Sequence, residues 1–193
     1  MSLQTHQSSQ AAAAPFSTFP EALSGDHWIE PLRDGTPVLI RPLREADRER
    51  ELAFINGLSH RARRFRFLGD FKQVSATQLN QLMNVDYNRL MAFIALIHDN
   101  GTLREIGVSR YSATADEKKC ECAVTVADEW QHRGLGVLLM RHLIDYARRQ
   151  GFKRMISVDA MTNEGMRDLA SYLGFRRETD PADSAMVVHT LEL

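Results

Sequence analysis

The spacing of apolar residues changes from that of a strand to that of a helix in the second half of the chain. Residues 122–127 form a short, apolar, β-branched run, which is typical of a buried strand. Apolar residues then recur at helical spacing over 135–147, and Gly151 supplies a helix end. This part of the chain predicts a strand, a tight turn and an amphipathic helix.

The remaining pattern predicts a mixed sheet flanked by helices. Residues 90–97 and 106–111, joined by a turn at 99–101, are typical of a hairpin, and a strand at 120–127 continues it. Further strands are expected at 38–43, 152–159 and 186–193, and further helices at 44–58, 75–83 and 163–173. The predicted fold class is α/β (α+β), with a central, largely antiparallel sheet.

The composition indicates one domain. With 193 residues, of which 44% are hydrophobic, the chain is long enough for one core and too short for two ordinary domains. Residues 1–25 are expected to form a flexible arm, and residues 26–193 the domain. A net charge of −1 gives no electrostatic case for a nucleic-acid partner, and no apolar run is long enough to span a membrane. We therefore expect a cytoplasmic protein.

The cysteines and histidines give no sign of a metal site. Cys120 and Cys122 lie two residues apart on a predicted strand, so they point to the same face, and a disulfide between them would be strained. The histidines lack the paired spacing of metal ligands, and His132 and His142 are more typical of a variable loop position and a packed helix position. No metal is expected.

The turn between the predicted strand and helix is a candidate anion site. Residues 131–136 read Gln-His-Arg-Gly-Leu-Gly. The first amides of a helix have no partner within the helix, and glycine lets a ligand approach the backbone, so a diphosphate would suit this position. The third glycine of the dinucleotide-binding fingerprint and the lysine of a Walker loop are absent. A helix start that binds nothing remains an alternative.

This turn also carries a resemblance to a known family. Residues 131–136 closely resemble motif A of the GNAT family of N-acetyltransferases, Gln/Arg-x-x-Gly-x-Gly/Ala, and the phrase Tyr-Leu-Gly-Phe at 172–175 is similar to a second recurring phrase of that family. Residues 38–43, 63–69 and 85–89 look like the acetyltransferase domain of bacterial Pat-type protein lysine acetyltransferases. The likeness covers roughly residues 36–178.

The resemblance implies the GNAT fold and acetyl-CoA as the acyl donor. In that family, backbone groups of the strand before the loop hold the pantetheine arm, and the loop amides hold the diphosphate. Arg133 could add its charge there or be an ordinary surface residue, and Asn163 could contact the cofactor or only cap a helix. The implied acetyl-CoA-binding residues are Val124, Thr125, Val126, Gln131, His132, Arg133, Gly134, Leu135, Gly136, Val137 and Asn163.

Glu121 is the candidate catalytic base. Amide formation from a thioester needs a neutral amine, and a lysine with a pKa of about 10.4 is mostly protonated at neutral pH. Glu121 lies at the start of the strand that leads into the loop, between apolar residues that would partly shield it from water. It matches the presumed base of the Pat-type domains, and the alternative is a solvated carboxylate.

One position departs from the family pattern. Many members have a tyrosine, proposed to protonate the leaving thiolate, where this chain has Ala170. Tyr172 lies about 200° further round the helix and cannot take over that role. A thiol with a pKa of about 8.5 can leave without a side-chain acid.

A basic cluster precedes the hairpin. Four arginines alternate there with aromatic residues, which could guide an acidic substrate or the 3′-phosphate of the cofactor, although such a cluster is more often a solvated helix face. Its members are Arg61, Arg63, Arg64, Arg66, Phe65 and Phe67.

Three functions compete. The first is direct acetyl transfer to a primary amine, and the Pat-like early segments favour a protein lysine as the acceptor, with a small-molecule amine or amino acid as the alternative. The second is a non-catalytic acyl-CoA-binding regulatory module, which would not need Glu121. The third, an unrelated nucleotide-binding domain, lacks its expected motifs. The sequence leaves the acceptor, the acyl-chain preference and the oligomeric state open.

Overall fold

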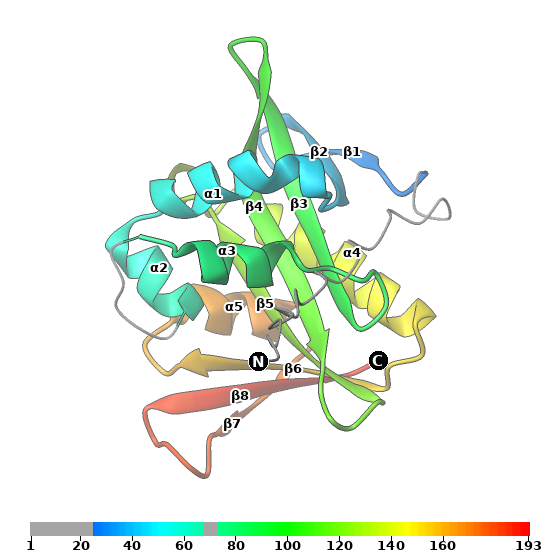
Figure 1. The fold of residues 1–193 in the computed structure, drawn as a ribbon. Coiled ribbons are helices and arrows are strands. Elements are labelled where there is room, and N and C mark those ends of the chain that lie inside the picture. The colour runs from blue at the N-terminus through cyan, green and yellow to red at the C-terminus, as the bar shows by residue number, and fades with distance from the viewer. Residues whose placement is uncertain (1–24, 68–72) are drawn as a thin grey trace, which may run out of the picture.

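The computed structural model describes residues 25–67 and 73–193, which form one eight-stranded sheet with helices on both faces (Figure 1). The strands are β1 (Trp28–Pro31), β2 (Pro37–Pro42), β3 (Leu90–Asp99), β4 (Thr102–Ala113), β5 (Lys119–Val126), β6 (Arg154–Ala160), β7 (Arg176–Thr179) and β8 (Met186–Glu192). The helices are η2 (Glu45–Asp47), α1 (Arg48–Gly57), α2 (His60–Phe67), α3 (Ala76–Met83), η3 (Asp128–Trp130), α4 (Leu135–Arg149) and α5 (Glu164–Tyr172), of which η2 and η3 are 3-10 turns.

The sheet is mixed and largely antiparallel, as the sequence predicts. Its strand order is β1-β2-β3-β4-β5-β6-β8-β7. Within the described residues, β5 and β6 are parallel and the other neighbouring strands are antiparallel. Parallel strands need a crossover connection, which α4 provides. The predicted fold class is confirmed.

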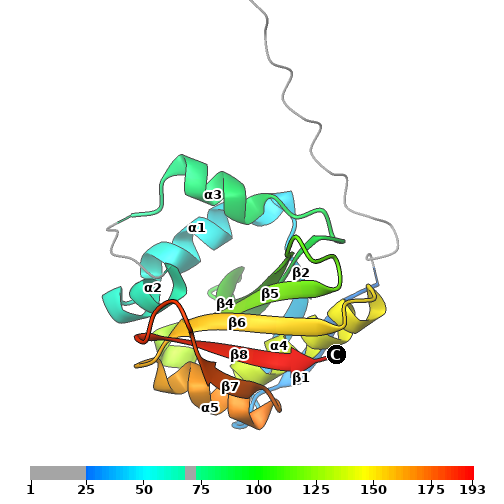
Figure 2. The ribbon, with the colours of Figure 1, turned by 90° about the horizontal axis from the view of Figure 1, so that it is seen from below.

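The sheet separates two hydrophobic cores. Helices α1, α2 and α3 cover one face, and α4 and α5 cover the other (Figure 2). Leu135, Leu139 and Leu143 of α4 are all buried against the sheet, as their helical spacing predicts. Phe54 and Ile55 of α1 belong to the core on the opposite face. Because side chains alternate along a strand, each central strand supplies residues to both cores.

The sequence pattern misses β1, α2 and β7. All residues of β7 are exposed, so the strand shows no apolar alternation. The helix α2 carries four arginines and has no fully buried residue, and β1 is only four residues long. The helix expected over 44–58 begins as η2 and continues as α1. The arm expected at 1–25 lies outside the described residues, apart from Gly25.

Candidate active site

Strands β5 and β6 part in the middle of the sheet. Their parallel pairing ends at Glu121 and Ile156, and no later residues of the two strands pair with each other in the described part of the chain. Residues 122–126 still pair with β4 on the other side. The backbone edge that β5 turns toward the gap suits an extended ligand that needs hydrogen-bond partners. The residues predicted to hold the pantetheine arm, Val124, Thr125 and Val126, lie on this stretch.

The loop between β5 and α4 is held by the turn between β1 and β2. The Arg33 amide donates to the Arg133 carbonyl at 3.0 Å. The Arg133 guanidinium pairs with Asp34 Oδ2 at 3.2 Å and lies 4.7 Å from the centroid of the Trp130 ring. Sequence reasoning missed this contact because the two segments are far apart in the chain. The protein itself therefore positions Arg133, and its contact with a diphosphate stays a prediction.

The two glycines of the loop differ in what the fold requires of them. Gly134 precedes α4 with a φ of 91°, a left-handed conformation that side chains disfavour. At Gly136 an added Cβ would lie 3.4 Å from Cδ2 of Leu169 on α5, which is an ordinary van der Waals contact. Packing therefore leaves room for a small side chain at Gly136, and its role in ligand access stays a prediction.

The first turn of α4 supplies donors for an anion. The Val137 and Leu138 amides donate to the Gly134 carbonyl at 3.1 and 3.2 Å. The amides that a helix leaves unpaired at its start therefore precede Val137 here, and the helix dipole adds a partial positive charge beside them. The Val137 amide already has an acceptor within the helix, and its contact with the diphosphate stays a prediction.

Gln131 and His132 complete the loop. The Gln131 side-chain nitrogen Nε2 donates to the Val126 carbonyl at 3.3 Å, which holds the end of β5 against the loop. His132 is exposed and has a φ of 62°. Neither side chain points to a cofactor by itself, so their cofactor contacts remain predictions.

The helix α5 shows the surroundings of Asn163 at its start and of Ala170 and Tyr172 near its end. Asn163 Oδ1 accepts a hydrogen bond from the Met166 amide at 3.2 Å, so Asn163 caps the helix, and a cofactor contact stays a prediction. Ala170 is fully buried, whereas Tyr172 is 63% exposed. The different surroundings agree with the expectation that Tyr172 does not replace a tyrosine at position 170.

Glu121 lines a pocket of about 320 Å³ between α2, α3 and the central strands. The register places Glu121 directly opposite Ser112 on β4. The side chains of Arg110, Ser112, Glu121 and Ala123 lie on the same face of the sheet and all four line the pocket. Arg66, Leu82, Val85 and Met91 contribute further walls.

The residues that flank Glu121 do not shield it. Cys120 and Cys122 are buried in the core on the α4 face, and Glu121 itself is exposed on the opposite face. The expected shielding by these neighbours is wrong because consecutive side chains of a strand alternate between faces. The two cysteines do share a face, and both are free thiols. Burial raises the pKa of Cys120 to about 12, so this thiol is unreactive at neutral pH.

A buried charge cluster lies beside the pocket. Arg110 Nη2 donates to Glu51 Oε1 at 2.6 Å, and Arg110 Nη1 donates to the Leu82 carbonyl at 2.9 Å. Glu105 is buried, and as a carboxylate it finds no donor in the described part of the chain. A protonated Glu105 can instead donate to Glu51. Burial and the adjacent Glu51 raise the pKa of Glu105 well above its ordinary value, which favours its neutral form in the folded protein.

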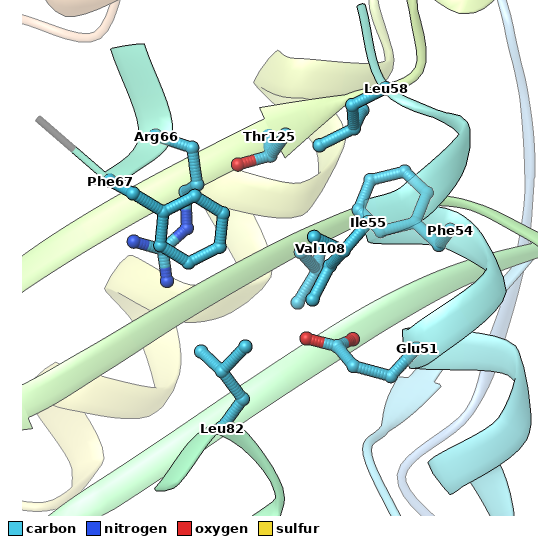
Figure 3. A pocket seen from close by; sticks show the side chains of 9 residues that line it. All are labelled: Glu51, Phe54, Ile55, Leu58, Arg66, Phe67, Leu82, Val108 and Thr125. Carbon is cyan, nitrogen blue, oxygen red and sulfur yellow. The ribbon is translucent and has the colours of Figure 1, made fainter. Parts of the chain in front are cut away.

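Arg66 is the member of the basic cluster that reaches the pocket. Arg66 lines the Glu121 pocket, and its guanidinium lies 4.9 Å from the centroid of the Phe67 ring. Arg66 also lines a second, tightly filled cavity, together with Glu51 and Thr125 (Figure 3). Burial and the Arg110 guanidinium lower the pKa of Arg66 to about 10, so Arg66 still carries its charge at neutral pH. Arg64 is exposed and lies outside the lining of the pocket.

The remaining candidates have structural roles. His142 stacks on Trp28 with ring centroids 4.0 Å apart, and its Nε2 lies 3.0 Å from Glu30 Oε1, which agrees with the expectation of a packed residue. Within residues 25–67 and 73–193, no group of three His, Cys, Asp or Glu side chains could hold a metal ion. The same residues form no helix that is long and apolar enough to cross a membrane.

A comparison with known families decides what this arrangement is. Residues 48–175 match the model of the acetyltransferase (GNAT) family. The chain belongs to the GNAT family. It is 58% identical over 172 residues to Acetyltransferase PA5475 of Pseudomonas aeruginosa, an alignment that covers 89% of this chain and 92% of the relative. The chain is therefore a GNAT-family acetyltransferase, and acetyl-CoA is the acyl donor that the family uses.

Solved GNAT structures share its fold. The GNAT domain of S. lividans PAT matches with a TM-score of 0.80 and 23% identity, covering 91% of this chain and 100% of that domain. The ribosomal-protein-S5-alanine acetyltransferase of Vibrio fischeri matches with a TM-score of 0.64 and 16% identity, covering 80% of this chain and 92% of the other. A cAMP-binding acyltransferase from Mycobacterium smegmatis matches with a TM-score of 0.58 and 23% identity, covering 86% of this chain and 46% of the other. At these identities the likeness shows the GNAT fold and leaves the acceptor open.

Proposed function

We propose that this GNAT acetyltransferase transfers the acetyl group of acetyl-CoA directly to a primary amine, with Glu121 as the general base. One observation carries the proposal. Glu121 lies in the wall of the 320 Å³ pocket and is also the last residue of β5 that pairs with β6 before the strands part. Its carboxylate therefore stands between a space that can hold an amine and a backbone edge that can hold a thioester.

Each part of the site has a defined task. Bound acetyl-CoA supplies an acyl thioester, at which the amine nitrogen forms a C–N bond while the C–S bond breaks. Glu121 takes a proton from the ammonium form of the acceptor, directly or through one water. Backbone amides of residues 124–126 would stabilise the negative charge on the carbonyl oxygen, and the first amides of α4 would hold the diphosphate. The amine nitrogen loses its second proton as the amide forms, and this proton passes through water to the leaving thiolate, since Ala170 cannot supply one.

The acceptor has two candidate classes. The sequence favours a protein lysine, on the likeness of the early segments to Pat-type domains. The structure adds a partly open pocket of about 320 Å³ beside Glu121, a volume that a small amine can fill. We therefore propose a small-molecule amine as the main acceptor and keep the protein lysine as the rival.

Ligand-induced stabilisation tests the cofactor. Because a ligand that binds only the folded state raises the melting temperature, we expect CoA and acetyl-CoA to raise it, and NAD and ATP to raise it much less. Equal shifts for all four ligands would contradict the assignment of the loop to a CoA diphosphate.

Substitution of the base tests the chemistry. Glu121→Gln should keep the CoA-induced shift and lower turnover by roughly 10² to 10⁴, the usual contribution of a positioned base. Glu117→Gln is the matched control, because Glu117 is a nearby carboxylate whose side chain is 85% exposed. Near-normal turnover in Glu121→Gln would place the base elsewhere. A lack of turnover in every form of the protein, wild type included, would favour a binding module.

A further inference from the structure

The pocket beside Glu121 has a cationic wall. Arg66 enters it from α2, and Arg110 enters it from β4. Two guanidinium groups in one small pocket repel each other, and this repulsion contributes to the lowered pKa of Arg66. The carboxylates around the two arginines determine which guanidinium group is available to bind an anionic ligand.

Arg110 is already neutralised by the protein. Its two terminal nitrogens bond the Glu51 carboxylate and the Leu82 carbonyl, at 2.6 and 2.9 Å. The side chains of Arg110 and Glu51 are both largely buried, so this pair is fixed. Glu105 is buried beside this pair, and within residues 25–67 and 73–193 it forms no ion pair with either arginine.

Arg66 has no such partner. No carboxylate in residues 25–67 or 73–193 forms an ion pair with it, and the contact of its guanidinium is the Phe67 ring. The charged groups that act on Arg66 are Arg110, Glu51 and Glu121. Glu51 is taken by Arg110, which leaves Glu121 as the balancing anion. Once Glu121 has accepted the proton of the amine, Arg66 faces the pocket without a counter-charge.

We propose that the acceptor is a small amine that carries a carboxylate, with Arg66 as the residue that binds the carboxylate while the amine faces Glu121. This inference rests on the proposed function and names its substrate class. Arginine binds carboxylates through two parallel hydrogen bonds, which fixes orientation as well as charge. An acceptor of this kind replaces the charge that Glu121 loses.

The size and lining of the pocket suit an amino acid. A volume of about 320 Å³ equals the share of about ten water molecules in the liquid. Leu82, Val85, Leu90 and Met91 provide apolar contact for a carbon skeleton between the two charged ends. A lysine side chain of a protein would bring only a cation to this wall.

The acceptor class is tested by matched substrates. The full chain is incubated with labelled acetyl-CoA and each of the twenty L-amino acids, and in parallel with the carboxamide of each. We expect at least one amino acid to be acetylated with a kcat/KM about 10- to 100-fold above that of its carboxamide, the range for loss of a charged hydrogen bond. Carboxamides as good as the acids, or label that enters only protein added from a cell extract, would overturn the inference.

Variants of α2 test the residue. Arg66→Gln should raise KM for the preferred amino acid about 10- to 100-fold, with little change in kcat and none in KM for the carboxamide. Arg66→Lys should recover part of the loss because it keeps the charge. Arg64→Gln is the control on the same helix, since Arg64 is exposed and lies outside the pocket.

Two outcomes separate failure of this inference from failure of the proposed function. An equal effect of Arg66→Gln on acids and carboxamides would mean that Arg66 only supports the fold, and would overturn the inference while acetyl transfer stands. If CoA stabilises the protein but no amine is acetylated, the proposed function fails and the inference falls with it. The thermal shift produced by the preferred amino acid alone gives a second readout, which Arg66→Gln should abolish and Arg64→Gln should retain.

Discussion

Glu105→Gln should make the protein more stable at neutral and alkaline pH. Glu105 is buried, and its raised pKa keeps it protonated in the folded state, whereas an exposed glutamate in the unfolded chain ionises near pH 4.3. A group of this kind contributes stability that is fully present below its unfolded pKa and is lost as the pH rises through its folded pKa. Glutamine mimics the protonated carboxyl, because its amide can donate to Glu51 as the acid does, and it cannot ionise.

The size of the expected stability difference follows from the titration of a single carboxyl group. Between the unfolded and folded pKa values of Glu105, the free energy of unfolding of the wild type should lose about 1.4 kcal/mol per pH unit relative to the variant. The gap should therefore open above the unfolded pKa of about 4.3 and widen until the pH reaches the raised pKa of the folded state. Chemical unfolding at several pH values between 5 and 9 measures the gap directly.

Other titrating groups do not disturb this comparison. Hydrogen bonds from Arg41 and Arg50 lower the pKa of Asp47 against its burial, so its contribution is lost only in acid. Burial lowers the pKa of His189, so stability rises with pH up to about 6.5 in both proteins alike. Glu178→Gln, at an exposed position of β7, should run parallel to the wild type. Parallel curves for Glu105→Gln as well would mean that Glu105 is ionised, and the charge balance around Arg66 would have to be revised.

Three further substitutions test the loop and the cap. Gly134→Ala should destabilise the protein by about 1–2 kcal/mol because of its left-handed backbone, and should weaken the CoA-induced thermal shift; Gly136→Ala, with ordinary contact to Leu169, should do neither. Asn163→Ala should cost about 1 kcal/mol by removing the bond to the Met166 amide, seen as a melting point lower by about 2–4 °C in a chain of this size. A loss of CoA affinity without a loss of stability would instead assign Asn163 to the cofactor.

The strand and the helix on either side of the glycine loop were predictable because their signals are local. The strand, the glycine turn and the helix follow each other within residues 119–149, and each has its own pattern of apolar residues or glycines. Glu121 stands on the same strand, so its place followed from the register of the motif. The contact of Arg33 with the loop was not predictable, since nothing in the turn between β1 and β2 indicates that it packs on residues 100 positions later.

The buried acidic cluster was hidden by an irregularity in the sheet. Between β3 and β4 the register shifts at Ala95 and Leu96, so that Gly107 pairs with the first and Glu105 with the second. An extra residue in one strand reverses which face the following side chains point to. Strict alternation from Tyr111 back to Glu105 would place Glu105 on the α4 face, yet it lies beside Glu51 of α1. A pattern that assumes period two cannot locate such a charge.

The two faces of β5 have different surroundings, which explains why the sequence indicates the reaction more clearly than the acceptor. Alternate residues of this strand face opposite ways: Cys122 and Val124 join the core under α4, while Glu121 and Ala123 face the pocket. Cys122 and Val124 belong to a continuous strand–turn–helix motif, and each segment of that motif has its own recognisable sequence pattern. The pocket is bordered by α2 and α3, whose pattern is dominated by polar residues and arginines that look like a solvated face. Arg64 and Arg66 lie two residues apart on α2 and so face about 200° apart, and tertiary packing decides which of these faces meets the pocket. Because both faces of the helix carry arginines, the sequence pattern alone does not show which arginine would contact the substrate.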